Sequence, residues 1–127
     1  MARIILVNND SDVRKAIGQK LFMQGFKVRT IFGDKKRHIL TETTLALYQA
    51  DIKRQLILVS DFMLLPSLDG PELLGLAKRI AVYRGLDLSC GITSDHPAEH
   101  GSYCPYLIIP KEHGLEYIFE SIKRLTA

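Results

Sequence analysis

One short stretch, residues 56–70, places the strongest constraint on the fold of this chain. It begins with an apolar run at residues 56–60 (LILVS), reaches the acid Asp61, and closes through a loop that ends at Asp69 and Gly70. A short apolar run bounded by turn residues is typical of a strand buried on both faces of a parallel sheet. Ligands of such sheets bind beyond the carboxyl ends of the strands, so Asp61 is a candidate site residue. The alternative is that Asp61 only begins a turn.

Apolar strand candidates alternate with amphipathic helical stretches along the rest of the chain. The expected strands are residues 3–7, 26–32, 56–60, a segment within 86–93, and 106–109. The expected helices run from a cap at Ser11 or Asp12 to Gly25, within 39–54, over 71–83 and over 115–125, with a loop or one short helix at 95–105. This alternation predicts a doubly wound α/β fold, a parallel five-stranded sheet with helices on both faces.

Composition bounds the function less tightly than it bounds the fold. The 127 residues suit a single domain, 1–127, and the net charge of +3 permits a polyanionic partner without requiring one. Cys90 and Cys104 lie outside any CxxC spacing, which favours two reduced thiols. We expect a cytoplasmic protein, because the sequence has no signal-peptide pattern and no apolar run of membrane-spanning length.

Polar and aromatic residues at the strand ends carry a resemblance to a known family. The pair Asn8-Asn9 follows the first strand, Asp61 ends the third, Thr93 ends the fourth, and Tyr106 opens the fifth, which closes on Pro110. In this order they resemble the receiver domain of bacterial two-component response regulators, over the whole chain. The resemblance implies the flavodoxin-like strand order 2-1-3-4-5, with a fourth helix that is short or absent here.

The resemblance also implies a site. Asp61 matches the acid that accepts a phosphoryl group, and the backbone carbonyl of Met63 matches a Mg²⁺ ligand. Thr93 and Tyr106 match the hydroxyl and the aromatic ring that move together when the family's switch operates. Asn8 and Asn9 stand where the family has two acids, so the pocket lacks two negative charges that a hard cation such as Mg²⁺ prefers.

Departures at the fifth strand and in two loops bear on the same chemistry. The family's lysine precedes the proline, where this chain has Ile109; Lys111 follows Pro110, and we expect it to point away from Asp61. The family's X-Pro bond is usually cis, and a cis Ile109–Pro110 bond is therefore expected. One additional residue separates Asp61 from the proline of the next turn. The segment between Thr93 and Tyr106 is short, so the switch surface is remodelled.

These departures favour a degenerate receiver, a pseudo-receiver that acts by phosphorylation-independent protein–protein interaction. It would stand alone, have no catalytic residues and no cofactor, and bind a histidine kinase or another signalling protein, with homodimerisation as a weaker expectation. The alternative is a conventional phospho-accepting receiver of a phosphorelay, with Asp61 as phosphoacceptor and Mg²⁺ as cofactor. Neither a membrane nor a nucleic acid is an expected partner.

Two further features have ordinary structural interpretations. The basic run at residues 35–38 (KKRH) is typical of a solvated helix start, with nucleic-acid contact as the alternative. His96 and His100 have the i,i+4 spacing of metal ligands on a helix, but Pro97 lies between them and no third ligand is evident. We therefore expect both histidines to be exposed in a loop.

Overall fold

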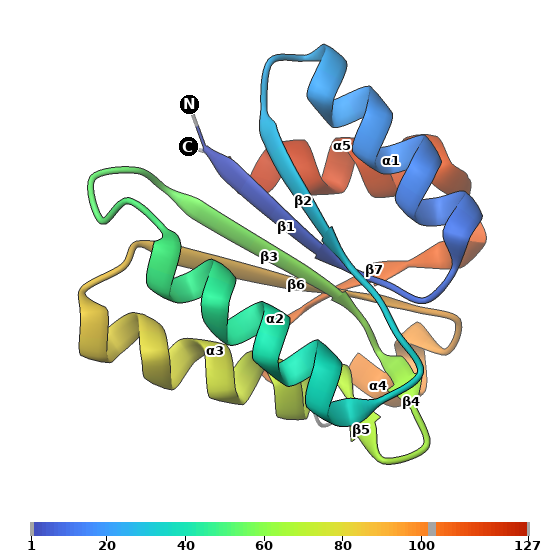
Figure 1. The fold of residues 1–127 in the computed structure, drawn as a ribbon. Coiled ribbons are helices and arrows are strands. Elements are labelled where there is room, and N and C mark those ends of the chain that lie inside the picture. The colour runs from blue at the N-terminus through green and yellow to red at the C-terminus, as the bar shows by residue number, and fades with distance from the viewer. Residues whose placement is uncertain (1, 102–103, 127) are drawn as a thin grey trace.

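A parallel sheet between helices forms the centre of the computed structural model, which describes residues 2–101 and 104–126 (Figure 1). The sheet strands are β1 Arg3–Val7, β2 Lys27–Ile31, β3 Leu56–Asp61, β6 Leu88–Ser94 and β7 Leu107–Pro110. All four pairings between them are parallel, and the order is β2-β1-β3-β6-β7. Since β6 and β7 are the fourth and fifth strands of this sheet, the predicted order 2-1-3-4-5 is confirmed.

Helices cover both faces of the sheet, as the alternating sequence pattern predicts. They are α1 Ser11–Met23, α2 Lys36–Gln49, α3 Gly70–Arg84, α4 Pro97–Gly101 and α5 Gly114–Leu125, with a 3-10 helix, η1 Lys111–His113. Figure 1 shows α2 and α3 on one face and α1 and α5 on the other. Helix α4 is a single short turn at the carboxyl edge of the sheet, in agreement with the expected shortening of the fourth helix.

Two hydrophobic cores lie on opposite faces of the sheet because successive strand residues point to opposite sides. From β1, Ile5 and Val7 pack into the core beneath α2 and α3. Their neighbours Ile4 and Leu6 pack into the core beneath α1 and α5. The central strand β3 is buried along its whole length, as expected for a parallel strand covered on both faces.

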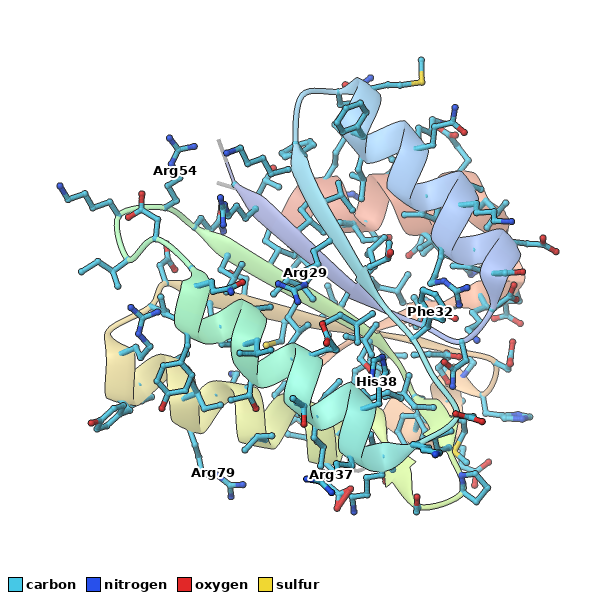
Figure 2. The ribbon with its side chains drawn as sticks, viewed as in Figure 1. Arg29, Phe32, Arg37, His38, Arg54 and Arg79 are labelled. Carbon is cyan, nitrogen blue, oxygen red and sulfur yellow. The ribbon has the colours of Figure 1, made fainter. Side chains whose placement is uncertain are left out.

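Some element boundaries differ from the predictions. Helix α2 starts at Lys36, so the basic run forms its first turn with Arg37 and His38 exposed (Figure 2), and it ends at Gln49 rather than near residue 54. Strand β7 begins at Leu107, one residue after the predicted start at Tyr106. These shifts change no pairing in the sheet.

A small hairpin after Asp61 was not predicted. Strands β4 Met63–Leu65 and β5 Leu68–Asp69 pair in antiparallel fashion and form a separate two-stranded sheet. Little in the sequence signals it, since only Leu68 is apolar on the far side of the Pro66-Ser67 turn. The hairpin leads directly into α3.

Candidate functional site

The predicted site residues Asn8, Asp61 and Thr93 lie at the carboxyl edge of the sheet. Asp61 is the last residue of β3 and pairs with Thr93 of β6, while Asn8 directly follows β1. Asn8, Asp61 and Thr93 are buried polar residues, as are Ser60 and Ser94 at the same strand ends. Buried polar groups in proteins nearly always have hydrogen-bond partners. The partners of these side chains therefore determine what the site can do.

Lys111 supplies a cation to Asp61, and the expectation that it points away is wrong. Its Nζ lies 2.6 Å from Asp61 Oδ1. The reason is local: β7 extends through Pro110, so Lys111 is the first residue beyond the strand and lies at the same carboxyl edge as Asp61. Ile109, at the position of the family's lysine, is instead fully buried in the core beneath α1 and α5. The Ile109–Pro110 bond is trans, contrary to the expected cis form.

Three donors reach one oxygen of the Asp61 carboxylate. Besides Lys111, the Thr93 hydroxyl donates to Oδ1 at 3.2 Å and the Phe62 amide donates to it at 3.1 Å. Burial nevertheless raises the pKa of Asp61 above its ordinary value, and the hydrogen bonds and charge from Lys111 and Thr93 only partly offset this. Desolvation of the charged form is therefore the dominant influence on this group.

A second carboxylate shares the lysine. Asp95 Oδ2 lies 3.7 Å from Lys111 Nζ, and its negative charge also raises the pKa of Asp61. The Asp95 side chain is largely exposed, so water screens its charge more than that of Asp61. One ammonium thus faces two carboxylates at this edge of the sheet.

The side-chain amide of Asn8 makes its hydrogen bond within the β1–α1 loop. Its Oδ1 accepts a hydrogen bond from the Asp10 amide at 2.8 Å. Asp10 in turn caps α1 by accepting from the amides of Asp12 and Val13, so the predicted cap at Ser11 or Asp12 is wrong. Because its carboxylate serves the helix start, Asp10 does not replace the missing acids beside Asp61.

The Asn9 amide joins three separate segments. Its Nδ2 donates to the backbone oxygen of Leu64 in β4 at 2.8 Å, and its Oδ1 accepts from the Gly33 amide after β2 at 2.9 Å. An aspartate could accept from Gly33 but could not donate to Leu64. The side chain that replaces the family's second acid therefore has a structural role that requires an amide.

The chain packs tightly behind Asp61. Gly70, the first residue of α3, donates its amide to the Phe62 oxygen at 2.7 Å. A Cβ on Gly70 would lie 2.7 Å from the backbone oxygen of Asp61, closer than real contacts allow. The sequence showed this glycine only as part of a turn, whereas the structure gives it a packing role that fixes the end of β3.

The donor set does not fit Mg²⁺. Apart from Met63, whose carbonyl stays a predicted ligand, the pocket offers the carboxylates of Asp61 and Asp95, both paired with Lys111. Its two asparagine oxygens already accept backbone hydrogen bonds. Across residues 2–101 and 104–126, no group of three or more His, Cys, Asp or Glu side chains could hold a metal ion. Mg²⁺ prefers carboxylate oxygens and water in octahedral geometry. The residues at this edge therefore lack the ligand set of a Mg²⁺ site.

The predicted switch residues lie in different surroundings. Thr93 is buried and its hydroxyl donates to Asp61. Tyr106 is half-buried and packs at the edge of the core beneath α2 and α3, and Lys78 Nζ lies 5.2 Å from the centre of its ring. Burial raises the pKa of Tyr106. Coupled movement of Thr93 and Tyr106 remains a prediction.

His100 adds a buried group that sequence reasoning missed. Its ring stacks on Phe62 at a centroid distance of 3.5 Å, and its Nδ1 lies 2.5 Å from the Ser94 hydroxyl. His96 is exposed as expected, but the prediction of an exposed His100 is wrong, because the α4 turn folds this residue back onto the strand end. The ring therefore connects α4 to the residue that follows Asp61.

Both cysteines are free thiols in the structure. Burial raises the pKa of Cys90 to about 11, so its thiol is not activated as a nucleophile. Within the part of the chain that the structure describes, no helix is long and apolar enough to cross a membrane.

This topology and the acid at the end of β3 define the fold of response-regulator receiver domains. Solved structures agree with this assignment over nearly the whole chain. The chemotaxis response regulator CheY4 of Vibrio cholerae has a TM-score of 0.69 at 18% identity, with 98% of each chain covered. The response regulator TrrA of Thermotoga maritima, solved with Mg²⁺ and BeF, has a TM-score of 0.66 at 16% identity, covering 98% of this chain and 99% of that one.

An enzyme is also among the structural neighbours. A structure described as adenylate cyclase from Rhodopirellula baltica has a TM-score of 0.70 at 17% identity, covering 97% of this chain and 85% of that one. No protein-family model and no curated protein matches the sequence. At these identities the structural likeness establishes the fold, and function must be argued from the site.

Proposed function

We propose that the chain is a receiver-like signalling module that works without phosphorylation of Asp61. In this proposal it is not an enzyme and has no cofactor. It acts by binding a protein partner, such as a histidine kinase or another signalling protein, with homodimerisation as a secondary possibility. The receiver fold and the polar residues at its carboxyl edge support the general class. The hydrogen bonds of the two asparagines support the degenerate form.

The observation that carries the proposal is the engagement of the Asn9 amide. Its donor and its acceptor both bind backbone groups, on Leu64 and Gly33. An acid at this position would lose the Leu64 bond, so the residue suits a fixed pocket better than a metal site. Without that negative charge, and without the one missing at Asn8, a divalent cation is held weakly. An incoming phosphate dianion then meets Asp61 and Asp95 with only Lys111 to offset the repulsion.

Acyl-phosphate formation tests the proposal directly. The protein is incubated with Mg²⁺ and acetyl phosphate, then examined quickly by intact mass, with Asp61→Asn as control and an ordinary receiver as positive reference. We expect no adduct on this chain under conditions in which the reference reacts. An adduct that is absent from Asp61→Asn would overturn the proposal.

A variant with restored acids sharpens this experiment. Asn8→Asp combined with Asn9→Asp returns two negative charges to the pocket. If the missing charges are what prevents the reaction, this variant forms a Mg²⁺-dependent adduct that the unchanged chain does not. An equally unreactive double variant that remains folded would show that another feature of the pocket blocks the chemistry.

A second candidate function is the phospho-accepting receiver, and the contact between Lys111 and Asp61 favours it. This ion pair supplies, from the far side of Pro110, the cation that Ile109 does not. It would orient the carboxylate and balance charge on a bound phosphoryl group. The mass measurement on the unchanged chain separates the two candidates. Where it gives an adduct, loss of that adduct in Lys111→Met would assign the lysine to phosphoryl transfer.

A further inference from the structure

A hollow at the amino edge of the sheet lies far along the strands from Asp61. It has a volume of about 210 Å³ and is formed by the first residues of β1 and β2, the start of β3, and the last turn of α2. The helix ends at Gln49 and the chain then leaves the sheet, so the amino ends of β1 and β2 are left partly uncovered. The lining combines basic and apolar side chains.

Three cations line this hollow from two adjacent strands. Arg3 pairs with Lys27 and Ile5 pairs with Arg29 in the parallel register. Because side chains alternate along a strand, Arg3, Lys27 and Arg29 lie on the face of the sheet that α2 covers. Figure 2 shows Arg29 extending from β2 into the space beside α2, whereas Arg79 points outward from α3.

The cations differ in how they are paired. Arg29 is fixed by Glu42 at 2.8 Å and by the Gln49 side chain at 3.1 Å. Among residues 2–101 and 104–126, no carboxylate lies within ion-pair distance of Arg3 or Lys27. Arg29 and Glu42 neutralise one another, so the hollow keeps two uncompensated positive charges.

Arg3 also carries an unsatisfied donor. Its Nε is buried and has no hydrogen-bond partner among the described residues. A buried N–H that lacks an acceptor is costly, and the cost is larger for a charged group. An anion in the hollow would balance the charges of Arg3 and Lys27, and a small movement of the Arg3 side chain would bring its buried N–H to that anion.

The remaining lining limits the size and nature of the ligand. Ile5, Ala46, Ala50 and Leu56 are buried apolar residues that contribute to the wall. A volume of about 210 Å³ is below the range of roughly 300–1,000 Å³ typical of drug-sized ligands. The hollow therefore suits a small molecule that has one anionic group and a short apolar body, and it is too small for a dinucleotide.

We propose that this hollow is a binding site for a small organic anion, held by Arg3 and Lys27 and oriented by Arg29. The apolar part of the ligand lies against Ala46 and Ala50, and the carboxylate or phosphate group accepts from the Arg3 guanidinium. The site is at the opposite end of the strands from Asp61 and does not depend on the phosphorylation state of that residue. Ligand binding here would stabilise the junction between β1, β2 and the end of α2.

Phenylphosphonate is a suitable probe because its phosphorus–carbon bond prevents phosphoryl transfer to Asp61. Titration into ¹⁵N-labelled protein, followed by NMR, is expected to give saturable shifts confined to the ends of β1, β2 and α2. Inorganic phosphate tests the charge alone, and benzyl alcohol tests the apolar part alone; both are expected to bind more weakly. Benzoate in place of phenylphosphonate distinguishes a carboxylate ligand from a phosphate ligand.

Three variants test the assignment. Arg3→Met and Lys27→Gln each remove one cation and are expected to weaken binding about ten-fold, the effect of one charge-assisted hydrogen bond. Ala46→Leu fills the hollow without changing charge and is expected to abolish binding. Arg79→Gln removes an exposed cation outside the hollow and is the matched control, with unchanged affinity.

The outcomes separate a built site from general electrostatic attraction. Thermal unfolding first establishes that each variant is folded. Saturable binding that is lost in Ala46→Leu and retained in Arg79→Gln supports the site. Shifts that spread over the basic surface, that fall equally in Arg79→Gln, or that do not saturate overturn it, whatever the result of the acetyl phosphate experiment.

Discussion

Lys111 Nζ lies 2.6 Å from Asp61 Oδ1, although Pro110 separates this lysine from the position where a receiver carries its own. Both side chains are mostly buried, with 18% of the lysine and 12% of the aspartate exposed. Lys111 therefore supplies the positive charge that Ile109 lacks, from a position two residues further along the chain. It also makes the carboxyl edge of the sheet depend on one ion pair.

Replacing Lys111 with methionine should destabilise the fold by about 1–3 kcal/mol. Removing one partner of a fully buried pair typically costs about 3–5 kcal/mol, and the residual exposure of this pair lowers the cost. Chemical denaturation at pH 7 measures the change. Lys36→Met is the matched control, because its ion pair with Glu72 is exposed and should be worth no more than about 1 kcal/mol. Equal losses in the two variants would contradict the special role of Lys111.

The raised pKa of Asp61 predicts a pH dependence of stability. A folded-state pKa above the ordinary value of 3.8 means that the folded chain keeps this proton to higher pH than the unfolded chain does. The contribution of Asp61 to stability should therefore be most favourable below 3.8 and should decline as pH rises to the folded-state pKa. Above that pH it should stay constant.

Comparison with Asp61→Asn isolates this effect, because the amide does not titrate. The free energy of unfolding of the unchanged chain, minus that of the variant, should fall as pH rises through this window. Denaturation curves at closely spaced pH values give the slope. A difference that increases with pH would mean that Lys111 outweighs burial in setting the pKa of Asp61.

The sequence predicted the scaffold of the site better than its contacts. Apolar runs and amphipathic stretches identified the five sheet strands, because burial on both faces leaves a clear pattern. The resemblance to receiver domains supplied their order. Asp61 and Thr93 were placed correctly because strand ends of a parallel sheet lie at one edge. No periodicity describes the chain after a strand, so the direction of Lys111, the burial of His100 and the β4–β5 hairpin were missed. These depend on turn geometry and on packing between distant residues.

Gly70 and Gly75 lie in the same helix and predict opposite results when replaced with alanine. A Cβ on Gly70 would meet the Asp61 oxygen at 2.7 Å, whereas nothing lies within 4 Å of the corresponding position on Gly75. We expect Gly70→Ala to destabilise the protein by about 1–3 kcal/mol, as overpacking does. Gly75→Ala should stabilise it by about 0.5–1 kcal/mol through helix propensity. Thermal and denaturant unfolding measure both, and a stabilising Gly70→Ala would refute the packing role.

The Asn9 bridge predicts a loss of stability when its amide is removed. Asn9→Ala deletes two hydrogen bonds, each worth about 0.5–1.5 kcal/mol, and should cost about 1–2 kcal/mol in the free energy of unfolding. Asn9→Asp keeps the acceptor for Gly33 and loses the donor to Leu64, so it should cost less than Asn9→Ala in the absence of metal. Gln24→Ala removes an exposed amide that has no side-chain hydrogen bond and should change stability by less than about 0.5 kcal/mol.

Hydrogen exchange locates the effect of the same change. If Asn9 ties β4 and the turn after β2 to the end of β1, then in Asn9→Ala the amides of Gly33 and of the β4–β5 hairpin should exchange faster, while those of β3 keep their protection. Faster exchange confined to α1 would instead assign the loss of stability to the helix start, where Asn8 and Asp10 make their own hydrogen bonds. Unchanged exchange at Gly33 and in the hairpin would contradict the bridge, and with it the structural reason for an amide in place of the acid.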